Sequence, residues 1–205
     1  MLKLIIRMGI PAGLQMALTS FSNVFVQSYI SNVNMDKTTA LGGWTTYSKL
    51  DQLIFLPLQT LGLATSTFVG QNLGSGQLDR ARKGPRIAWG MGTGITLFLM
   101  LPILLFAEPL ASVFNADPEI VSCAALLLRC LTPFYLFSCV NQIYSNALRG
   151  AGNSTAPMVI MLVSFVGFRQ IYLFFMSSFL SNELLPIAFG YPAGWAVCAL
   201  ITLLY

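Results

Sequence analysis

The chain contains no histidine, and only 9% of its 205 residues are charged. Without imidazole it lacks the commonest acid–base catalyst and the commonest metal ligand of proteins. Ordinary globular domains carry about 25% charged residues, so this chain is too poor in charge to cover the surface of a soluble fold. Its four cysteines form no C-x-x-C pair, which argues against a zinc site or a disulfide framework. We therefore expect no metal site, no cofactor and no enzymatic activity.

The residues that are present are mostly apolar: hydrophobic types make up 56% of the chain, and the mean hydropathy is +0.72. A helix needs about 20 such residues to cross a bilayer. The sequence predicts an all-α integral membrane protein in which residues 1–205 form a single bundle of six transmembrane helices. The predicted spans are approximately 8–33, 42–73, 87–107, 119–147, 155–181 and 185–205.

Charged residues in the loops alternate in sign along the chain and predict its orientation. The loop after the second span carries Arg80, Arg82, Lys83 and Arg86, and Arg149 follows the fourth span. The intervening loops are mostly acidic. By the positive-inside rule both termini are cytoplasmic and the protein is a multi-pass protein of the plasma membrane. The net charge of +4 is then a mark of topology, and we expect the lipid bilayer, not nucleic acid, as the surrounding partner.

Polar side chains recur inside the predicted spans. In the first span they follow a spacing of four residues, which makes one slanted stripe along the helix. Polar groups in hydrocarbon need partners, so this face is expected to line a wet cavity or to form hydrogen bonds between helices. The cavity-lining candidates are Gln15, Asn23, Gln27, Gln52, Asn141 and Gln142.

Four ionisable residues lie inside the spans, and they are the candidate ion- or substrate-binding residues: Lys49, Asp51, Arg129 and Arg169. At a rise of about 1.5 Å per residue, the last three fall roughly 14 to 18 Å from one end of their spans, near the middle of the bilayer. Lys49 lies nearer the outside and is expected to snorkel. Asp51 is expected to meet Arg129 or Arg169, either as a structural ion pair or as the centre of a binding site.

Glycine and proline predict where the helices pack and bend. Gly90 and Gly94 have the G-x-x-x-G spacing that favours close contact between membrane helices. Pro57 lies within the long second span and offers a kink there.

Several short strings, taken together and in order, resemble the multidrug and toxic compound extrusion (MATE) family, and specifically the second half of a bacterial member. They cover nearly the whole chain. The strings are GIPAGLQ at 9–15, YSKLDQ at 47–52, TFVGQNLG at 67–74 with DRA at 79–81, NQIY at 141–144, ALRGAGN at 147–153, FRQIY at 168–172, and YP at 191–192.

The resemblance implies a twelve-helix transporter made of two six-helix lobes, of which this chain supplies helices seven to twelve. It implies export of drugs and other xenobiotics, often cationic and amphipathic, driven by inward flow of Na⁺ or H⁺. It also implies a partner: the absent first lobe or a second copy of this chain. Well-studied branches carry coupling acids in helices seven and ten. The corresponding helices here contain none, which leaves Asp51 as the intramembrane acid.

Two alternatives to a drug exporter remain open at this stage. One is a lipid or lipid-linked oligosaccharide flippase of the same superfamily, for which Lys49, Arg129 and Arg169 would supply the cations that phosphates need. The other is a half-lobe remnant that does not transport unless a partner joins it.

Overall fold

The computed structural model describes residues 2–205, and within this part the side chains of residues 2–5, 7 and 8 are not described. All the regular structure in the described chain is helical. The elements are α1 (Leu2–Ile30), α2 (Lys37–Gly74), α3 (Leu78–Leu105), α4 (Ala107–Ser112), α5 (Pro118–Leu131), η1 (Thr132–Phe134), α6 (Tyr135–Gly150), α7 (Thr155–Leu162), η2 (Val163–Phe168), α8 (Arg169–Phe175), η3 (Met176–Leu180), α9 (Leu184–Ala188) and α10 (Gly190–Leu204).

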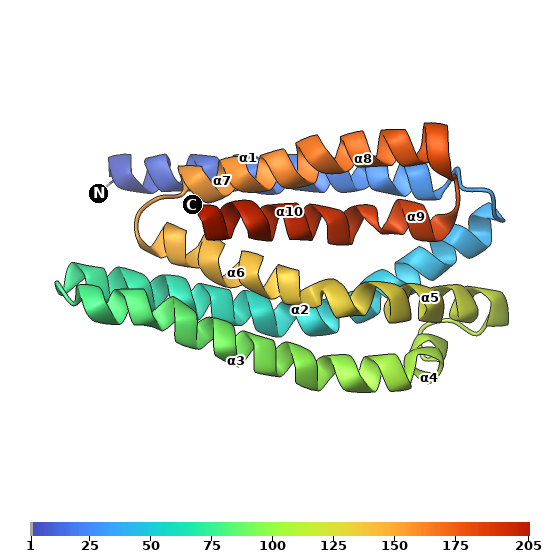
Figure 1. Cartoon of the computed structure of the whole chain (residues 1–205), viewed down its shortest axis with the longest axis horizontal. Helices are drawn as coiled ribbons and strands as arrows, with labels where there is room; N and C mark the ends of the chain where they lie inside the picture. Colours follow the sequence, from blue (N-terminus) through green and yellow to red (C-terminus); the bar gives the residue numbers. More distant parts are fainter. Residues whose placement is uncertain (1) are drawn as a thin grey trace.

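The helices form an elongated bundle whose long members run up and down its long axis (Figure 1). The N-terminal end of α1, the α2–α3 turn, the α6–α7 connection and the end of α10 lie at one end of the bundle. The α1–α2 connection, α4 and α9 lie at the other. Both ends of the described chain lie at the same end of the bundle (Figure 1).

Five segments are long and apolar enough to cross a membrane: Lys37–Gly74, Leu78–Leu105, Pro118–Gly150, Thr155–Leu180 and Leu184–Leu204. The first predicted span falls on α1, which is not one of the five in this test of the described residues. The described surface is rich in large apolar side chains such as Met16, Phe98 and Leu204. Exposed apolar surface of this extent matches a solvent of lipid rather than water.

Helix α2 organises the bundle, because it packs against α3, α5 and α6. Its 38 residues make it about 57 Å long, far longer than a hydrocarbon core of about 30 Å. It begins at Lys37, five residues before the predicted start, since the Asp36 carboxylate caps it by accepting from the Thr39 N–H at 3.0 Å. That bond lowers the pKa of Asp36.

The fourth predicted span is broken where Pro133 lies. Helix α5 ends at Leu131, a short 3₁₀ turn (η1) follows, and α6 begins at Tyr135. The fifth span is interrupted differently: wide π-helical turns, η2 and η3, stand on both sides of α8. Such turns occur often at functional sites.

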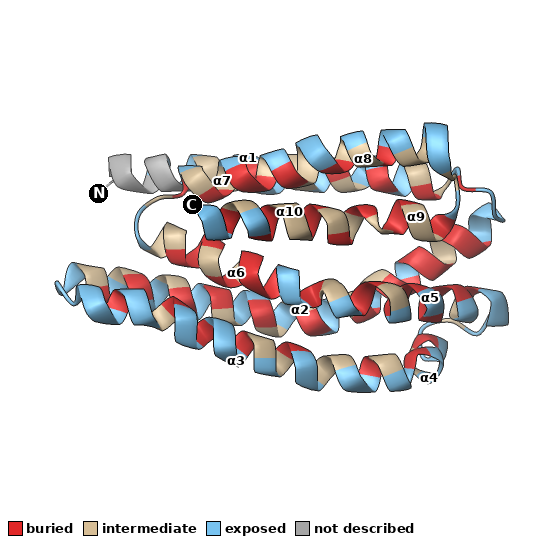
Figure 2. Ribbon diagram, in the orientation of Figure 1, coloured by how far each residue is buried: buried red, intermediate tan, exposed pale blue. Residues whose placement is uncertain are grey.

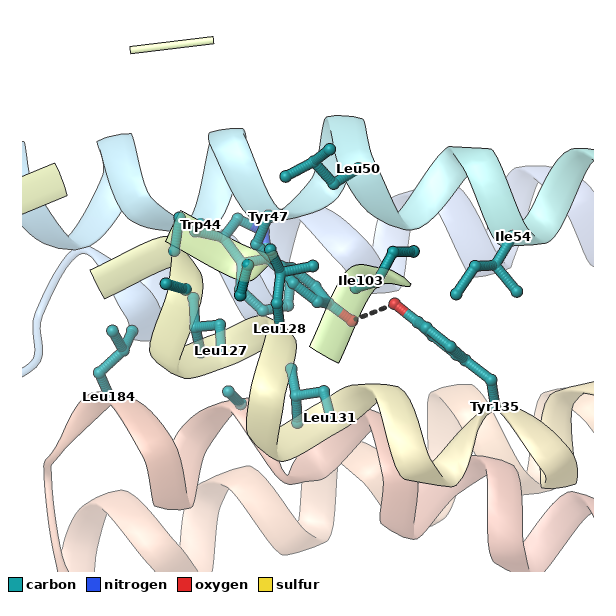
Figure 3. Packing of buried hydrophobic residues seen from close by; sticks show 14 of the residues in the cluster. Trp44, Tyr47, Leu50, Ile54, Ile103, Leu127, Leu128, Leu131, Tyr135 and Leu184 are labelled. Atoms are coloured by element: carbon teal, nitrogen blue, oxygen red, sulfur yellow. Dashed lines mark hydrogen bonds between the residues drawn. The ribbon is translucent and has the colours of Figure 1, made fainter. Parts of the chain in front are cut away.

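The buried core lies along the seam of α2, α5 and α6, and its side chains include Leu50, Ile54, Leu127, Leu128 and Leu131 (Figures 2 and 3). These residues are almost fully buried. The core therefore fixes α2 against α5 and α6, and it positions any polar group that these helices carry.

The glycine spacing at Gly90 and Gly94 does not mark a close helix contact. A side-chain carbon added at either glycine would meet no atom within 4 Å, so the predicted G-x-x-x-G packing is wrong for the described lobe. Close contact is found instead at Gly62, where such a carbon would lie 2.6 Å from Asn146 Nδ2 and 3.0 Å from the Gln142 carbonyl oxygen. The α2–α6 contact requires glycine there.

Candidate functional site

Asp51 forms one polar centre with two tyrosines. Tyr47 lies one helical turn before it on α2 and donates to Asp51 Oδ1 at 3.3 Å. Tyr135, the first residue of α6, donates to the same oxygen. The two phenol oxygens are 3.3 Å apart, and Figure 3 shows the two rings meeting between α2 and α6. We call Tyr47, Asp51 and Tyr135 the carboxylate centre.

Aromatic rings surround this centre and limit the access of water. Phe55 and Trp195 lie 5.7 and 5.5 Å from the Tyr135 ring, and Trp44 lies 5.1 Å from the Tyr47 ring. Trp195 stands near the middle of the Leu184–Leu204 span. The carboxylate centre therefore lies at the level of the middle of the shortest span, deep in the bilayer.

Arg169 forms a second polar centre on the other side of the bundle. Arg169 is 3% exposed, and its guanidinium donates to Ser22 Oγ at 2.8 Å and Asn23 Oδ1 at 2.9 Å, both on α1. Gln170 adds a bond to the same Ser22 oxygen. No carboxylate lies within 4 Å of Arg169 in the part of the chain that the structure describes. We call Arg169, Ser22, Asn23 and Gln170 the arginine centre.

Tyr191 on α10 connects the two centres. Its ring lies 4.7 Å from the Arg169 Cζ and 5.1 Å from the Trp44 ring, and its hydroxyl is 3.3 Å from Asn23 Oδ1. The rings of Tyr191 and Trp44 thus separate the acid from the arginine. The lobe holds a half-buried acid, Asp51, and a buried cation, Arg169, on opposite sides of an aromatic layer.

The expected pairing of Asp51 with Arg129 or Arg169 is wrong. Arg129 points outward and pairs with Glu108 at 3.2 Å, where both side chains are about half exposed. Arg169 uses neutral partners on α1. Two tyrosines take the place of the expected arginine, since α6 presents Tyr135 at the level where α2 presents Asp51.

Lys49 faces away from the carboxylate centre, as its spacing of two residues from Asp51 predicts. Its side chain is exposed and its Nζ lies 5.7 Å from the centroid of the Phe114 ring, in the α4–α5 connection. Gln52 and Gln27 are exposed too. The side chains of Lys49, Gln52 and Gln27 are therefore free to contact lipid or another protein segment that covers α1 and α2.

Two of the predicted cavity-lining residues are internal hydrogen-bonding groups. Gln15 is buried and accepts from Arg149 Nη2 at 2.7 Å, and Asn141 is buried and donates to the Trp195 carbonyl at 3.0 Å. Both join helices that are distant in sequence, as the alternative of hydrogen bonds between helices expects, and their lining of a cavity stays a prediction. Asn23 and Gln142 are half-buried.

The residues that sequence reasoning missed are the partners: Ser22, Tyr47, Tyr135 and Tyr191. Tyr47 had a usable signal, because it lies four residues before an intramembrane acid. Tyr135 had none, since it lies 84 residues from Asp51 along the chain and reaches it only through the break at η1.

The arrangement of the carboxylate centre suits a small cation. Asp51 offers one oxygen to two phenol donors, and no group of three acidic, cysteine or histidine side chains occurs among the described residues. Helix α2 is continuous through Asp51, so its backbone is not unwound there. A carboxylate that exchanges a proton with its surroundings needs no further ligands.

Comparison with known proteins gives consistent matches over most of the chain. The MatE family model matches residues 11–175. A Bacillus subtilis relative called probable multidrug resistance protein YoeA is 29% identical over 201 residues, which are 98% of this chain and 43% of the relative. A Shewanella oneidensis protein called FAD transporter is 24% identical over 76% of this chain and 34% of its own length.

Solved structures agree in fold. A transporter of the MOP superfamily from Pyrococcus furiosus superposes with a TM-score of 0.90 at 19% identity and covers 98% of this chain and 44% of that one. A crystal structure described as MATE in complex with MaL6 gives a TM-score of 0.91 at 19% identity, over 99% and 45%. The chain therefore spans less than half of the length of the proteins it matches.

Proposed function

The chain belongs to the MatE family, and from this membership we propose that it acts as one six-helix lobe of a cation-coupled exporter of drugs and other xenobiotics. The relatives called multidrug resistance proteins support this proposal. The second lobe would come from the same longer protein or from a second copy of this chain. Parallel lobes of this kind are related by an axis along the membrane normal.

The observation that carries the proposal is the carboxylate centre. Asp51 is the one acid in the described chain that lies deep inside a span, because the other six stand at helix ends or in connections. Intramembrane acids are costly and mark ion pathways. We propose that binding of the coupling cation at Asp51 and binding of a cationic amphipathic drug exclude each other, which is the basis of antiport.

The geometry favours H⁺ over Na⁺ as the coupling cation. Two phenol donors already satisfy one Asp51 oxygen. Transporters that bind Na⁺ generally use unwound backbone carbonyls for it, and α2 is continuous through Asp51. A proton needs only the carboxylate.

The loop charges support a location in the plasma membrane with both termini in the cytoplasm. In this orientation α2 begins outside at Lys37 and ends inside at Gly74. Asp51 is closer to Lys37 than to Gly74 along the helix, so it lies closer to the outer end of α2. Protons would reach Asp51 from the outside when the transporter opens outward.

The experiment that tests the proposed function uses the whole protein in a host that lacks its own drug-efflux pumps. Expression should raise resistance to a cationic dye such as ethidium and lower its accumulation. A protonophore should abolish the effect, whereas replacing external Na⁺ with K⁺ should leave it unchanged. Loss on Na⁺ replacement would contradict H⁺ coupling, and unchanged dye accumulation on expression would contradict export.

One observation favours a second candidate, a flippase for phosphate-bearing lipids: the buried Arg169 has no carboxylate partner within the described chain. Phosphate groups prefer arginine. This candidate predicts loss of cell-envelope glycan or lipid on deletion and no change in dye accumulation, the reverse of the result expected for the exporter.

A further inference from the structure

A groove opens among Val69, Leu73, Pro85 and Leu203, at the end of the bundle where the α2–α3 turn and the end of α10 lie (Figure 1). Its volume is about 420 Å³. Four helices form its walls, which are mostly apolar. The wall residues include Val69 and Leu73 of α2, Pro85 of α3, Leu148 of α6 and Leu203 of α10. An apolar groove at this end of a membrane helix bundle can hold a hydrocarbon chain.

Basic side chains without acidic partners stand at the same end of α3. Arg82 is part of the groove wall, and Arg80, Lys83 and Arg86 lie within a turn or so of it, all exposed. The described chain contains one salt bridge, between Arg129 and Glu108, so none of these four cations has a carboxylate within 4 Å. The first turn holds a single acid, Asp79.

From these observations we propose that the groove between α2, α3, α6 and α10 binds an anionic phospholipid of the cytoplasmic leaflet, with an acyl chain against Leu73 and Leu203 and the headgroup phosphate at Arg82. The un-neutralised cations select a negative headgroup over a zwitterionic one. The apolar wall selects a lipid over a soluble phosphate. The inference goes beyond the transport activity and does not depend on what is exported.

The test measures binding of the first lipid to the purified membrane protein in detergent, by native mass spectrometry, with phosphatidylglycerol and phosphatidylcholine as probes. The wild type should bind phosphatidylglycerol more tightly, by about fivefold for one well-placed arginine. Arg82→Gln should bring the two affinities together, and Arg82→Lys should keep most of the preference. Arg82 is exposed and has no acidic partner, so these variants are expected to fold.

Arg80→Gln is the matched control, because it removes the same charge from the same turn of α3 but lies outside the groove wall, bonded to Gln77 at 3.1 Å. It should keep the preference. If Arg80→Gln and Arg82→Gln lost the preference for phosphatidylglycerol equally, the lipid would bind to a diffuse basic surface. That result would overturn the groove site.

A second variant changes the shape of the groove and leaves its charge alone. Ala147 belongs to the wall, and Ala147→Phe should fill the space for the acyl chain and weaken phosphatidylglycerol binding. Equal binding of the two lipids by the wild type, as expected if a further protein segment fills the groove, would overturn the proposal. So would binding of glycerol phosphate as tight as that of phosphatidylglycerol.

Discussion

At the residue scale, the carboxylate centre depends on a bond between side chains 84 residues apart. Tyr135→Phe removes the O–H that α6 donates to Asp51 and leaves the ring in its aromatic contacts. A hydrogen bond to a charged group contributes about 1.5–3 kcal/mol, so we expect at least about a tenfold fall in cation-driven transport with the protein still in the membrane.

Tyr29→Phe is the control for this change. Tyr29 is half-buried, and its hydroxyl makes no hydrogen bond among those of the described residues, so the same chemical change should leave transport unaltered. Efflux rates of the two variants, normalised to the amount of protein in the membrane, give the comparison. Similar losses in both would contradict the role assigned to Tyr135.

Arg169 is expected to act first on stability. Arg169→Met removes one donor from Ser22 and one from Asn23, which keep Gln170 and the Tyr191 hydroxyl as partners, and should lower the free energy of unfolding by about 1–3 kcal/mol. Arg169→Lys should recover part of it, because an ammonium cannot reproduce the planar fork of the guanidinium. Arg86→Gln, at an exposed site, should stay within about 0.5 kcal/mol. Thermal unfolding in detergent measures the stability of all three variants. If Arg169→Met were as stable as the wild type, the arginine centre would not have a structural role.

The sequence predicted which ionisable residues matter better than it predicted their partners. Asp51 and Arg169 stand out because charge within a span is costly. Their neighbours depend on rotation and bending that no pattern records: Arg129 lies on the outer side of α5, where it meets Glu108, and Tyr135 reaches Asp51 only because η1 breaks the helix.

At the element scale, the α2–α6 contact is expected to be the most sensitive to added volume. Gly62→Ala places a methyl group 3.0 Å from the backbone oxygen of Gln142, which cannot move without shifting α6. Overpacking of this kind costs about 1–3 kcal/mol. Gly90→Ala, on a helix surface with nothing within 4 Å, is the matched control and should be neutral. Thermal unfolding measures the stability of the two variants. Equal stability of Gly62→Ala and Gly90→Ala would contradict the close α2–α6 contact.

The helices themselves follow the sequence where hydropathy and caps agree. The α2–α3 turn falls where the basic loop was expected, with Gly76 at φ 75°. The π-helical turns around α8 and the open surface at Gly90 and Gly94 were not predictable, because both depend on which neighbour a helix meets. Local spacing sets a helix and its faces, and tertiary contact decides which face is used.

At the scale of the whole molecule, the orientation in the membrane can be measured directly. Val113, between α4 and α5, is 76% exposed, and Ser75 is exposed in the α2–α3 turn at the opposite end. A membrane-impermeant thiol reagent applied to intact cells should label Val113→Cys. It should reach Ser75→Cys only after the membrane is opened.

The native thiols give little background in this experiment, since three of the four cysteines are buried and Cys130 is half-buried. The unaltered protein under both conditions is the control. Labelling of Ser75→Cys in intact cells, with Val113→Cys protected, would reverse the orientation and move the lipid groove to the outer leaflet.

If Asp51 couples drug export to an inward proton flow, proteoliposomes of the whole protein should show this coupling. With Na⁺ absent and a pH gradient imposed, the wild type should move a cationic dye against its gradient. Asp51→Asn should give no uphill transport while it remains folded, and Asp51→Glu should retain some. Uphill transport by Asp51→Asn at the wild-type rate would contradict this coupling and remove Asp51 from the coupling site.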